Sequence, residues 1–336
     1  MTEQRTARDP EQHLYLLFDD WHSGYSIRKV SLSRRSAKRA EQPLASGSGE
    51  GAEPLPGVFM RVQALRGYSE YFTSAFGTKI AAMHPGPTGT GVPMIDVRDL
   101  IFISGPMANN NIIPIYFPIG DKRLFVLDFA TFDCFQWMPE NSEQPWVWEG
   151  LPYPPFERLD VSSYGVQPDG CILISTKSGA TFVFDTNDYV WKPYGNFALP
   201  FTGRGYYDTS LEGFVGLSKE DREGGPSKDP ETLGYLYCCT GADFKRTREK
   251  VYSNNPAERH VSATLLHMWP GKFCLVECVS IDNGGAERFM YRLKTFCLVY
   301  DEERDLKLKH CHVRCYSPPR EATTDFIRKD PAAFWL

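Results

Sequence analysis

The sequence predicts an all-β fold, a single β-propeller of about six blades with kelch-like blade length. Two observations support this. Short apolar or alternating runs bounded by Gly, Pro, Asn and Asp fill the chain, with almost no helical spacing. An apolar run that ends in Asp also recurs, each time followed by a second strand-like run. The alternative all-β architecture is a pair of large β-sandwiches.

The recurring Asp predicts a hairpin with a stabilised turn. Five copies carry Asp96, Asp128, Asp185, Asp243 and Asp301, at intervals of 32, 57, 58 and 58 residues. In each copy the carboxylate can accept hydrogen bonds from the turn backbone while the chain returns as a second strand. The Pro168-Asp169-Gly170 turn upstream of the third copy indicates two further strands, hence four per unit. Counting the N-terminal hairpin as part of another unit gives about six.

The order of segments predicts one domain. We expect residues 1–12 to be a disordered N-terminus, 13–318 to form the propeller and 319–336 to be a C-terminal tail. The first hairpin spans residues 14–19 and 25–32. Two polar stretches, residues 33–57 and 218–234, are too poor in apolar residues to build a core and are expected to be disordered insertions. In the tail, Thr323-Thr324-Asp325 is typical of a helix N-terminus.

Charge and hydrophobicity exclude several classes of protein. The 336 residues include 37 Lys and Arg against 42 Asp and Glu, a net charge of −5 that argues against direct nucleic-acid binding. No run of about 18 apolar residues and no secretory leader is seen, so we expect no membrane association and a cytoplasmic or nuclear location.

Nine cysteines indicate free thiols rather than a disulfide framework. Residues 34–39, RRSAKR, are a nuclear-import signal, a kinase site at Ser36 or a solvated charge run.

Several longer segments resemble one known family. These are residues 14–32, 148–170, 199–218, 255–268 and 330–336, beginning LYLLFDDW, WEGLPYPP, LPFTGRGYYD, NPAERHV and DPAAFWL. Together they resemble a plant family expanded in grasses and known as domain of unknown function sixteen sixty-eight. The resemblance spans nearly the whole chain and implies a relation to kelch and F-box-associated propellers. No helical F-box module precedes the first hairpin, so we do not expect a complete ubiquitin-ligase receptor.

The motifs that could carry chemistry are weak. HCHVRC supplies His310, Cys311, His312 and Cys315, near Cys274 and Cys278, yet on a strand these donors face opposite sides or lie about 13 Å apart. The HPGPTGTG run at residues 84–91 lacks the rest of a phosphate-binding loop, and no nucleophile elbow is present. We therefore expect no metal and no cofactor, and catalysis has no support in the sequence.

The remaining candidate site is the mouth of the central channel, where the first strand of each blade begins. The candidate binding residues there are Asp160, Arg204, Arg259 and His260. The alternative is that the arginines only form inter-blade ion pairs, for example with Asp160 or Asp208. We predict a non-catalytic, monomeric protein-interaction module, an adaptor or scaffold whose protein or peptide partner carries acidic groups. The alternative function is an enzyme with its active site at the channel mouth, the less favoured of the two.

Overall fold

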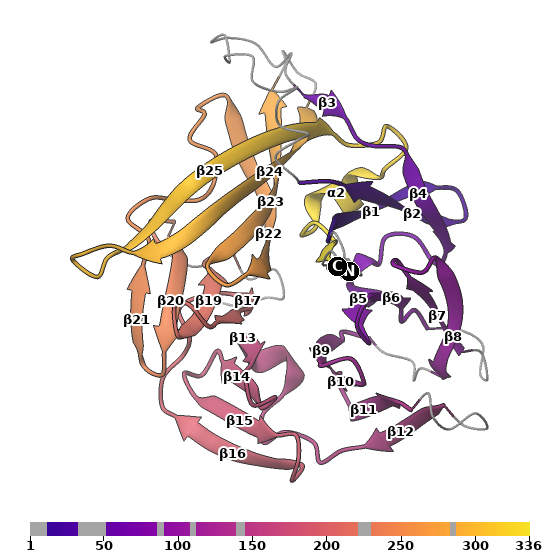
Figure 1. Cartoon of the computed structure of the whole chain (residues 1–336), viewed down its shortest axis with the longest axis vertical. Coiled ribbons are helices and arrows are strands. Elements are labelled where there is room, and N and C mark those ends of the chain that lie inside the picture. The colour runs from indigo at the N-terminus through magenta and orange to yellow at the C-terminus, as the bar shows by residue number, and fades with distance from the viewer. Residues whose placement is uncertain are drawn as a thin grey trace, which may run out of the picture.

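The structure, a computed structural model, describes residues 12–32, 52–85, 91–107, 112–138, 145–220, 230–282 and 287–336. Within these ranges it forms six β-sheets arranged as blades around a central axis, which confirms the predicted six-bladed all-β propeller (Figure 1). No helix in the described ranges has the length and apolar character needed to cross a membrane.

The first three blades are four-stranded antiparallel sheets. In order from the axis outward, blade 1 has β26 (Ala333–Trp335), β1 (Leu14–Trp21), β2 (Gly24–Val30) and β4 (Val58–Gln63). Blade 2 has β5 (Phe72–Ala75), β6 (Lys79–Ala82), β7 (Gly91–Asp96) and β8 (Ile101–Met107). Blade 3 has β9 (Ile115–Ile119), β10 (Arg123–Leu127), β11 (Phe132–Trp137) and β12 (Trp146–Gly150).

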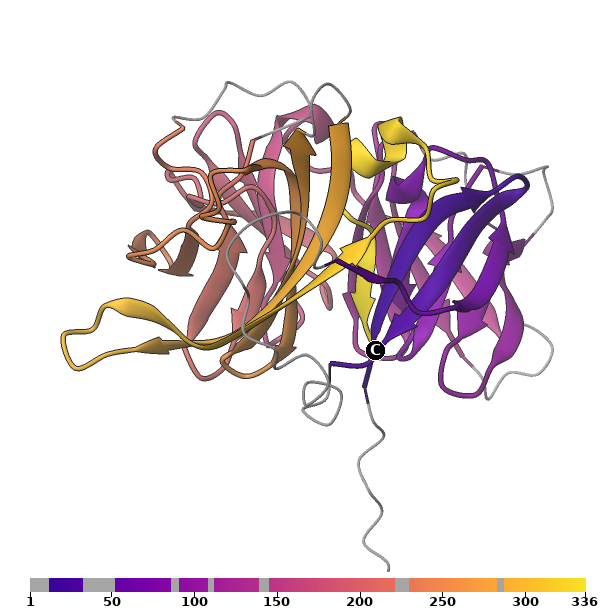
Figure 2. The same ribbon diagram turned by 90° about the horizontal axis from the view of Figure 1, so that it is seen from above.

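The other three blades repeat this order, and two of them gain a short parallel strand. Blade 4 has β13 (Val161–Val166), β14 (Ile172–Thr176), β15 (Thr181–Asp185) and β16 (Val190–Gly195), with β17 (Gly203–Arg204) beside β13. Blade 5 has β18 (Tyr206–Asp208), β19 (Gly213–Leu217), β20 (Leu236–Thr240) and β21 (Asp243–Arg246). Blade 6 has β22 (Glu258–Trp269), β23 (Lys272–Asp282), β24 (Glu287–Tyr300) and β25 (Leu306–Ser317), with β3 (Glu53–Pro54) beside β25. Its outer hairpin, β24–β25, reaches well beyond the ring (Figure 2).

The C-terminal segment closes the ring, where the sequence predicted a tail outside the domain. The three-residue strand β26 pairs with β1 and so becomes the innermost strand of the blade that begins the chain. The predicted helix is present as α2 (Thr324–Arg328), and the Thr323 side chain caps it by accepting from the Phe326 N–H at 3.2 Å. Blade 1 is therefore built from both ends of the described chain.

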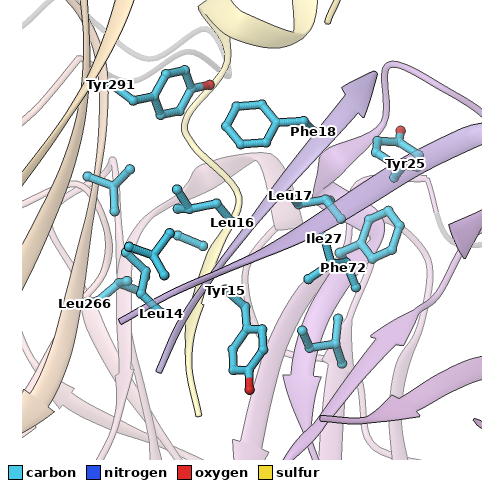
Figure 3. Close-up of a cluster of buried hydrophobic side chains, with 14 of the residues drawn as sticks. Leu14, Tyr15, Leu16, Leu17, Phe18, Tyr25, Ile27, Phe72, Leu266 and Tyr291 are labelled. Atoms are coloured by element: carbon cyan, nitrogen blue, oxygen red, sulfur yellow. The ribbon is translucent and has the colours of Figure 1, made fainter. Parts of the chain in front are cut away.

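Apolar side chains between blades form the core. Around blade 1, the largest cluster joins residues of blades 1, 2 and 6 with the side chains of α2 (Figure 3). In it the Phe18 ring meets Tyr291 of blade 6 edge-on, with ring centroids 5.1 Å apart, and Tyr25 meets Phe72 of blade 2 at 4.8 Å. Blade 1 is thus packed against both of its neighbours.

The recurring aspartates turn out not to occupy one equivalent position. Asp96 and Asp185 end the third strands of blades 2 and 4 and accept hydrogen bonds from turn N–H groups, such as Arg98 N at 3.0 Å, as predicted. Asp128 instead follows the second strand of blade 3 and accepts from Ile112 and Ile113, just before the blade's first strand. Asp243 begins the outermost strand of blade 5. This mixture of positions explains the uneven intervals in the sequence.

Parts of the two predicted insertions are ordered. Residues 52–57 are described, and Glu53–Pro54 form β3 against Tyr316 and Ser317 of β25. In the second stretch Ser218 is buried, and its N–H donates to the Tyr235 carbonyl at 2.9 Å. Residues 33–51 and 221–229, including the RRSAKR run, lie outside the described residues, as do residues 1–11 of the predicted disordered N-terminus.

Candidate functional site

A cavity of about 670 Å³ lies on the axis of the ring. Blades 2 to 6 contribute residues of, or just before, their innermost strands, and the C-terminal segment at residues 329–335 contributes the wall of blade 1. Its size is that of a typical small-ligand or side-chain pocket. The lining mixes apolar side chains with an unusual number of phenol and charged groups.

Arg204 is the cationic group that stands out on this wall. It ends β17, which pairs in parallel with β13, and it is only partly exposed. One guanidinium nitrogen donates to the Tyr116 carbonyl of blade 3, and the guanidinium lies 5.9 Å from the centre of the Tyr164 ring. Among the residues that the structure describes, no carboxylate forms an ion pair with Arg204.

The Tyr206 phenol beside Arg204 is neutral at ordinary pH. Burial raises the pKa of Tyr206, and the neighbouring guanidinium offsets only part of that rise. Burial acts to lower the pKa of Arg204, yet its contacts with the Tyr206 and Tyr164 phenols leave that pKa above its ordinary value. A full positive charge therefore faces the cavity beside the neutral phenol of Tyr206.

An imidazole–carboxylate pair lies beside this cation. The His267 ring, from β22 of blade 6, lines the cavity and stacks on Tyr206 with ring centroids 6.1 Å apart. Its Nε2 is 3.0 Å from Asp208 Oδ2 at the end of β18. Asp208 is fully buried and also accepts from the N–H groups of Gly271, Ser210 and Leu211. The hydrogen bond between His267 and Asp208 therefore joins blade 6 to blade 5.

The hydrogen bonds to Asp208 fix its charge state. Burial opposes ionisation, but the hydrogen bonds from His267, from Ser210 and from the backbone of Gly271 and Leu211 together lower its pKa to about 2. Asp208 is therefore a carboxylate at neutral pH, and it holds a hydrogen on Nε2 of His267. The other ring nitrogen, Nδ1, has no hydrogen-bond partner in the described part of the chain.

Other charged groups of the cavity wall are already paired. Lys219 forms an ion pair with Asp330, and Lys329 forms one with Glu70 at 3.1 Å. Arg158 is buried and donates through Nε to the Ile113 carbonyl at 2.7 Å. These contacts tie the C-terminal segment and the loop before β9 to the wall. Arg204 has no carboxylate partner among the residues that the structure describes.

The structure does not gather the four residues that the sequence singled out. The strand starts are where the sequence placed them, since β13, β17 and β22 begin at Val161, Gly203 and Glu258. However, only Arg204 is among the cavity-lining residues. Asp160 is exposed and contacts Lys177 through its carbonyl oxygen, which accepts from the Lys177 N–H at 2.7 Å.

Arg259 and His260 lie apart from Arg204, near the start of a twelve-residue strand whose cavity-facing part begins five residues later. At about 3.3 Å per residue this separates Arg259 from the cavity by roughly 16 Å. The Arg259 side chain is 75% exposed and pairs with Glu287, not with Asp160 or Asp208. His260 stacks on Tyr252 at 3.7 Å and contacts buried Glu277 at 3.0 Å. The length of β22 therefore separates Arg259 and His260 from the cavity.

His267 is a functional candidate that the sequence did not predict, and Asp208 was predicted only as an ion-pair partner. The two are 59 residues apart and belong to different blades, so no local motif joins them. The available signal was the dense run GRGYYDTS at residues 203–210, where Arg204, Tyr206 and Asp208 share the alternation of one strand.

The HCHVRC segment lies on β25, the fourth strand of blade 6 counted from the axis. His310 has a φ of 53°, and the register with β24 shifts between Thr295 and Cys297, so a bulge interrupts the strand there. The regular alternation assumed from the sequence therefore does not apply at this point. Within the described ranges, no three His, Cys, Asp or Glu side chains converge in the way a metal ion needs.

Comparison with known proteins places the chain in a family. Residues 11–316 match the family described as protein of unknown function (DUF1668), and the chain belongs to that family. No curated protein sequence matches it. Among solved structures it is similar to Hsv2 of Kluyvelomyces marxianus, with 7% identity, a TM-score of 0.38 and coverage of 77% of this chain and 89% of that one. It is also similar to virginiamycin B lyase from Staphylococcus aureus, with 9% identity, a TM-score of 0.37 and coverage of 74% and 83%.

Proposed function

We propose that this propeller is a protein-interaction module that holds an acidic group of its partner in the central cavity, against Arg204. The observation that carries the proposal is a partly buried guanidinium that faces the cavity and has no carboxylate partner in the described part of the chain. Charges removed from water are normally paired, because their desolvation is otherwise uncompensated. A carboxylate from outside supplies the missing partner.

The chemistry of the wall fits a carboxylate on a polypeptide. A guanidinium has five N–H donors and can direct two parallel hydrogen bonds to a carboxylate. Arg204 donates to the Tyr116 carbonyl and also contacts the Tyr164 and Tyr206 phenols. The phenols of Tyr164 and Tyr206 are further donors beside it. Apolar residues such as Phe72, Leu265 and Phe334 line the same cavity and suit the aliphatic part of an acidic side chain.

The fold does not test the predicted oligomeric state, location, lack of a cofactor or blade type, and these predictions are kept in the proposal. We propose that the module works as a monomer in the cytoplasm or nucleus, without a cofactor, and that its blades are of the kelch type. The acidic partner predicted from the sequence is retained, while the binding group is reduced from four residues to one of them, Arg204, with new neighbours.

The binding test uses matched peptides. We expect fluorescent capped hexapeptides rich in Glu and Asp to bind, and the same peptides with Gln and Asn not to bind, because only the carboxylates can pair with Arg204. Arg204→Met should weaken binding of the acidic set about 10-fold to 100-fold, the effect of losing a charge-assisted hydrogen-bonded pair. Fluorescence anisotropy gives the Kd.

The control for this experiment is Arg259→Met, which removes an equally large cation from a side chain that is 75% exposed and outside the cavity. It should leave the Kd unchanged. Equal binding of the acid and amide peptides, or equal losses from the two arginine variants, would contradict a specific role for Arg204. Both variants should still unfold in one cooperative transition, which separates a loss of binding from a loss of folding.

An enzyme at the channel is the second candidate function, and the His267–Asp208 pair favours it. A carboxylate that orients the imidazole of a cavity-lining histidine is the arrangement of a general base. Mass spectrometry of the bound peptide distinguishes the two functions. An interaction module returns the peptide with its mass unchanged, whereas an enzyme returns a product that disappears in His267→Gln.

A further inference from the structure

We propose that the channel site takes a ligand with two neighbouring carboxylates, one on Arg204 and one on His267, and that binding is coupled to uptake of a proton by His267. This inference rests on the proposed function and names its ligand class and its regulation. The two groups share one wall, because Tyr206 lies between them, touching the guanidinium on one side and stacked on the imidazole at 6.1 Å on the other.

The proton that is taken up has a defined position. Nε2 of His267 is engaged with Asp208 at 3.0 Å, and Asp208 is held as a carboxylate by backbone N–H groups that cannot turn away. Nδ1 is therefore the atom left to gain a proton. Protonation there converts His267 from a possible acceptor into a second cationic donor at the cavity wall.

The groups that face His267 come from three elements. On β18 these are the carboxylate of Asp208, which favours a charged imidazole, and the neutral phenol of Tyr206. On β23 the neighbour is the apolar Phe273 ring, at 5.1 Å. Behind Tyr206, on β17, lies the positively charged guanidinium of Arg204, which contacts the Tyr206 phenol.

The ligand changes this balance. A carboxylate seated on Arg204 cancels the repulsion between the two cations, and a second carboxylate near Nδ1 favours the charged imidazole directly. Ligand binding and proton binding at His267 are linked, and the linkage is reciprocal. A ligand that favours protonation of His267 must therefore bind more tightly to the protein in which His267 is already protonated. Affinity should therefore rise as the pH falls from 8.0 to 5.5.

A diacid of this kind has two sources with the same chemistry. It is either a free small dicarboxylic acid or a peptide with two nearby acidic side chains. The probes are glutarate for the first and the capped peptide acetyl-Glu-Gly-Glu-amide for the second. The peptide carboxylates stay largely ionised at pH 5.5, and the affinity of glutarate is corrected for its own ionisation at each pH. Binding of both indicates that the carboxylate pair suffices, and binding of the peptide alone indicates that the chain is also recognised.

Calorimetric titration at pH 5.5, 7.0 and 8.0 tests the coupling. For the wild type we expect about tenfold tighter binding at pH 5.5 than at pH 8.0, and at pH 7.0 a binding enthalpy that varies with the ionisation enthalpy of the buffer. His267→Gln keeps a side-chain donor toward Asp208 but cannot gain a proton. It should therefore bind with the same affinity at all three pH values, close to the wild-type affinity at pH 8.0.

The control is His260→Gln, which alters the other paired histidine of the same strand and should keep the wild-type pH dependence. A pH dependence that survives in His267→Gln overturns the coupling but leaves binding at Arg204 intact. Binding of neither probe by the wild type at any pH overturns both this inference and the proposed function. Wild-type and His267→Gln proteins should share one Tm at pH 8.0 within a few degrees, and a collapse there would instead assign His267 a purely structural role.

Discussion

Ending the chain at Pro331 should abolish cooperative folding of the whole propeller. The five residues removed include all of β26, which is the innermost strand of blade 1 and pairs with Leu14, Tyr15 and Leu16 of β1. They also carry the last hydrogen bonds of that ladder, between His13 and Leu336 at 2.7 and 3.1 Å. Without them the buried β1 becomes an open edge at the axis of the ring.

The measurement is the thermal unfolding transition followed by circular dichroism, with the near-ultraviolet signal of the buried aromatics as a second probe. A point variant in the same region should give a smaller, measurable loss of stability. Phe326→Ala keeps β26 but empties a buried site of α2 in contact with Phe18, so it should lower the free energy of unfolding by about 3 to 5 kcal/mol. A truncated protein that unfolds at the wild-type Tm would show that the ring is not closed by its C-terminal strand.

Asp208→Asn should produce the second largest loss, about 3 to 5 kcal/mol of unfolding free energy. The variant keeps the shape of the side chain but removes a fully buried negative charge that receives hydrogen bonds from Gly271, Leu211, Ser210 and His267. An amide nitrogen turned toward any of these donors leaves both groups unsatisfied, and breaking a buried charged network has costs of this size. Urea unfolding measures the loss.

The pH dependence of stability offers an independent check on Asp208. Its pKa in the folded protein is about 2, against an ordinary value of 3.8. Because the folded-state pKa is the lower one, the stabilisation is present above about pH 4 and is lost as the pH falls toward 2, about 2 kcal/mol in all. Asp208→Asn should therefore flatten the acid side of the stability curve in that interval.

The local features of the fold were predictable from the sequence because hairpins are local. The alternation around Asp96 and Asp185 identified third and fourth strands together with their turns, and the Thr323 cap located α2. Adding such hairpins gave six blades. The predicted role of the recurring aspartate was wrong for Asp128. Its carboxylate accepts from the Ile112 and Ile113 N–H groups, just before the first strand of blade 3, and not from the turn that follows it.

The closure of the ring and the site depend on contacts between distant residues. β26 is only three residues long, too short for any strand pattern, and it becomes a strand because β1 offers it an open edge. His267 and Asp208 meet because neighbouring blades place the ends of β22 and β18 side by side. Arg259 carries the same charge as Arg204, and only the length of β22 decides that it lies on the outside.

Nuclear magnetic resonance of the arginine side chains tests the central claim most directly. The Nε–Hε signal of Arg204 is assigned by its absence in Arg204→Lys and followed while the acidic hexapeptides are added at pH 6. The structure predicts that this signal shifts and saturates with the same Kd as the anisotropy measurement, while the signal of Arg259 stays in place. A peptide that binds with the Arg204 signal unmoved would contradict the assignment of the cavity as the binding site.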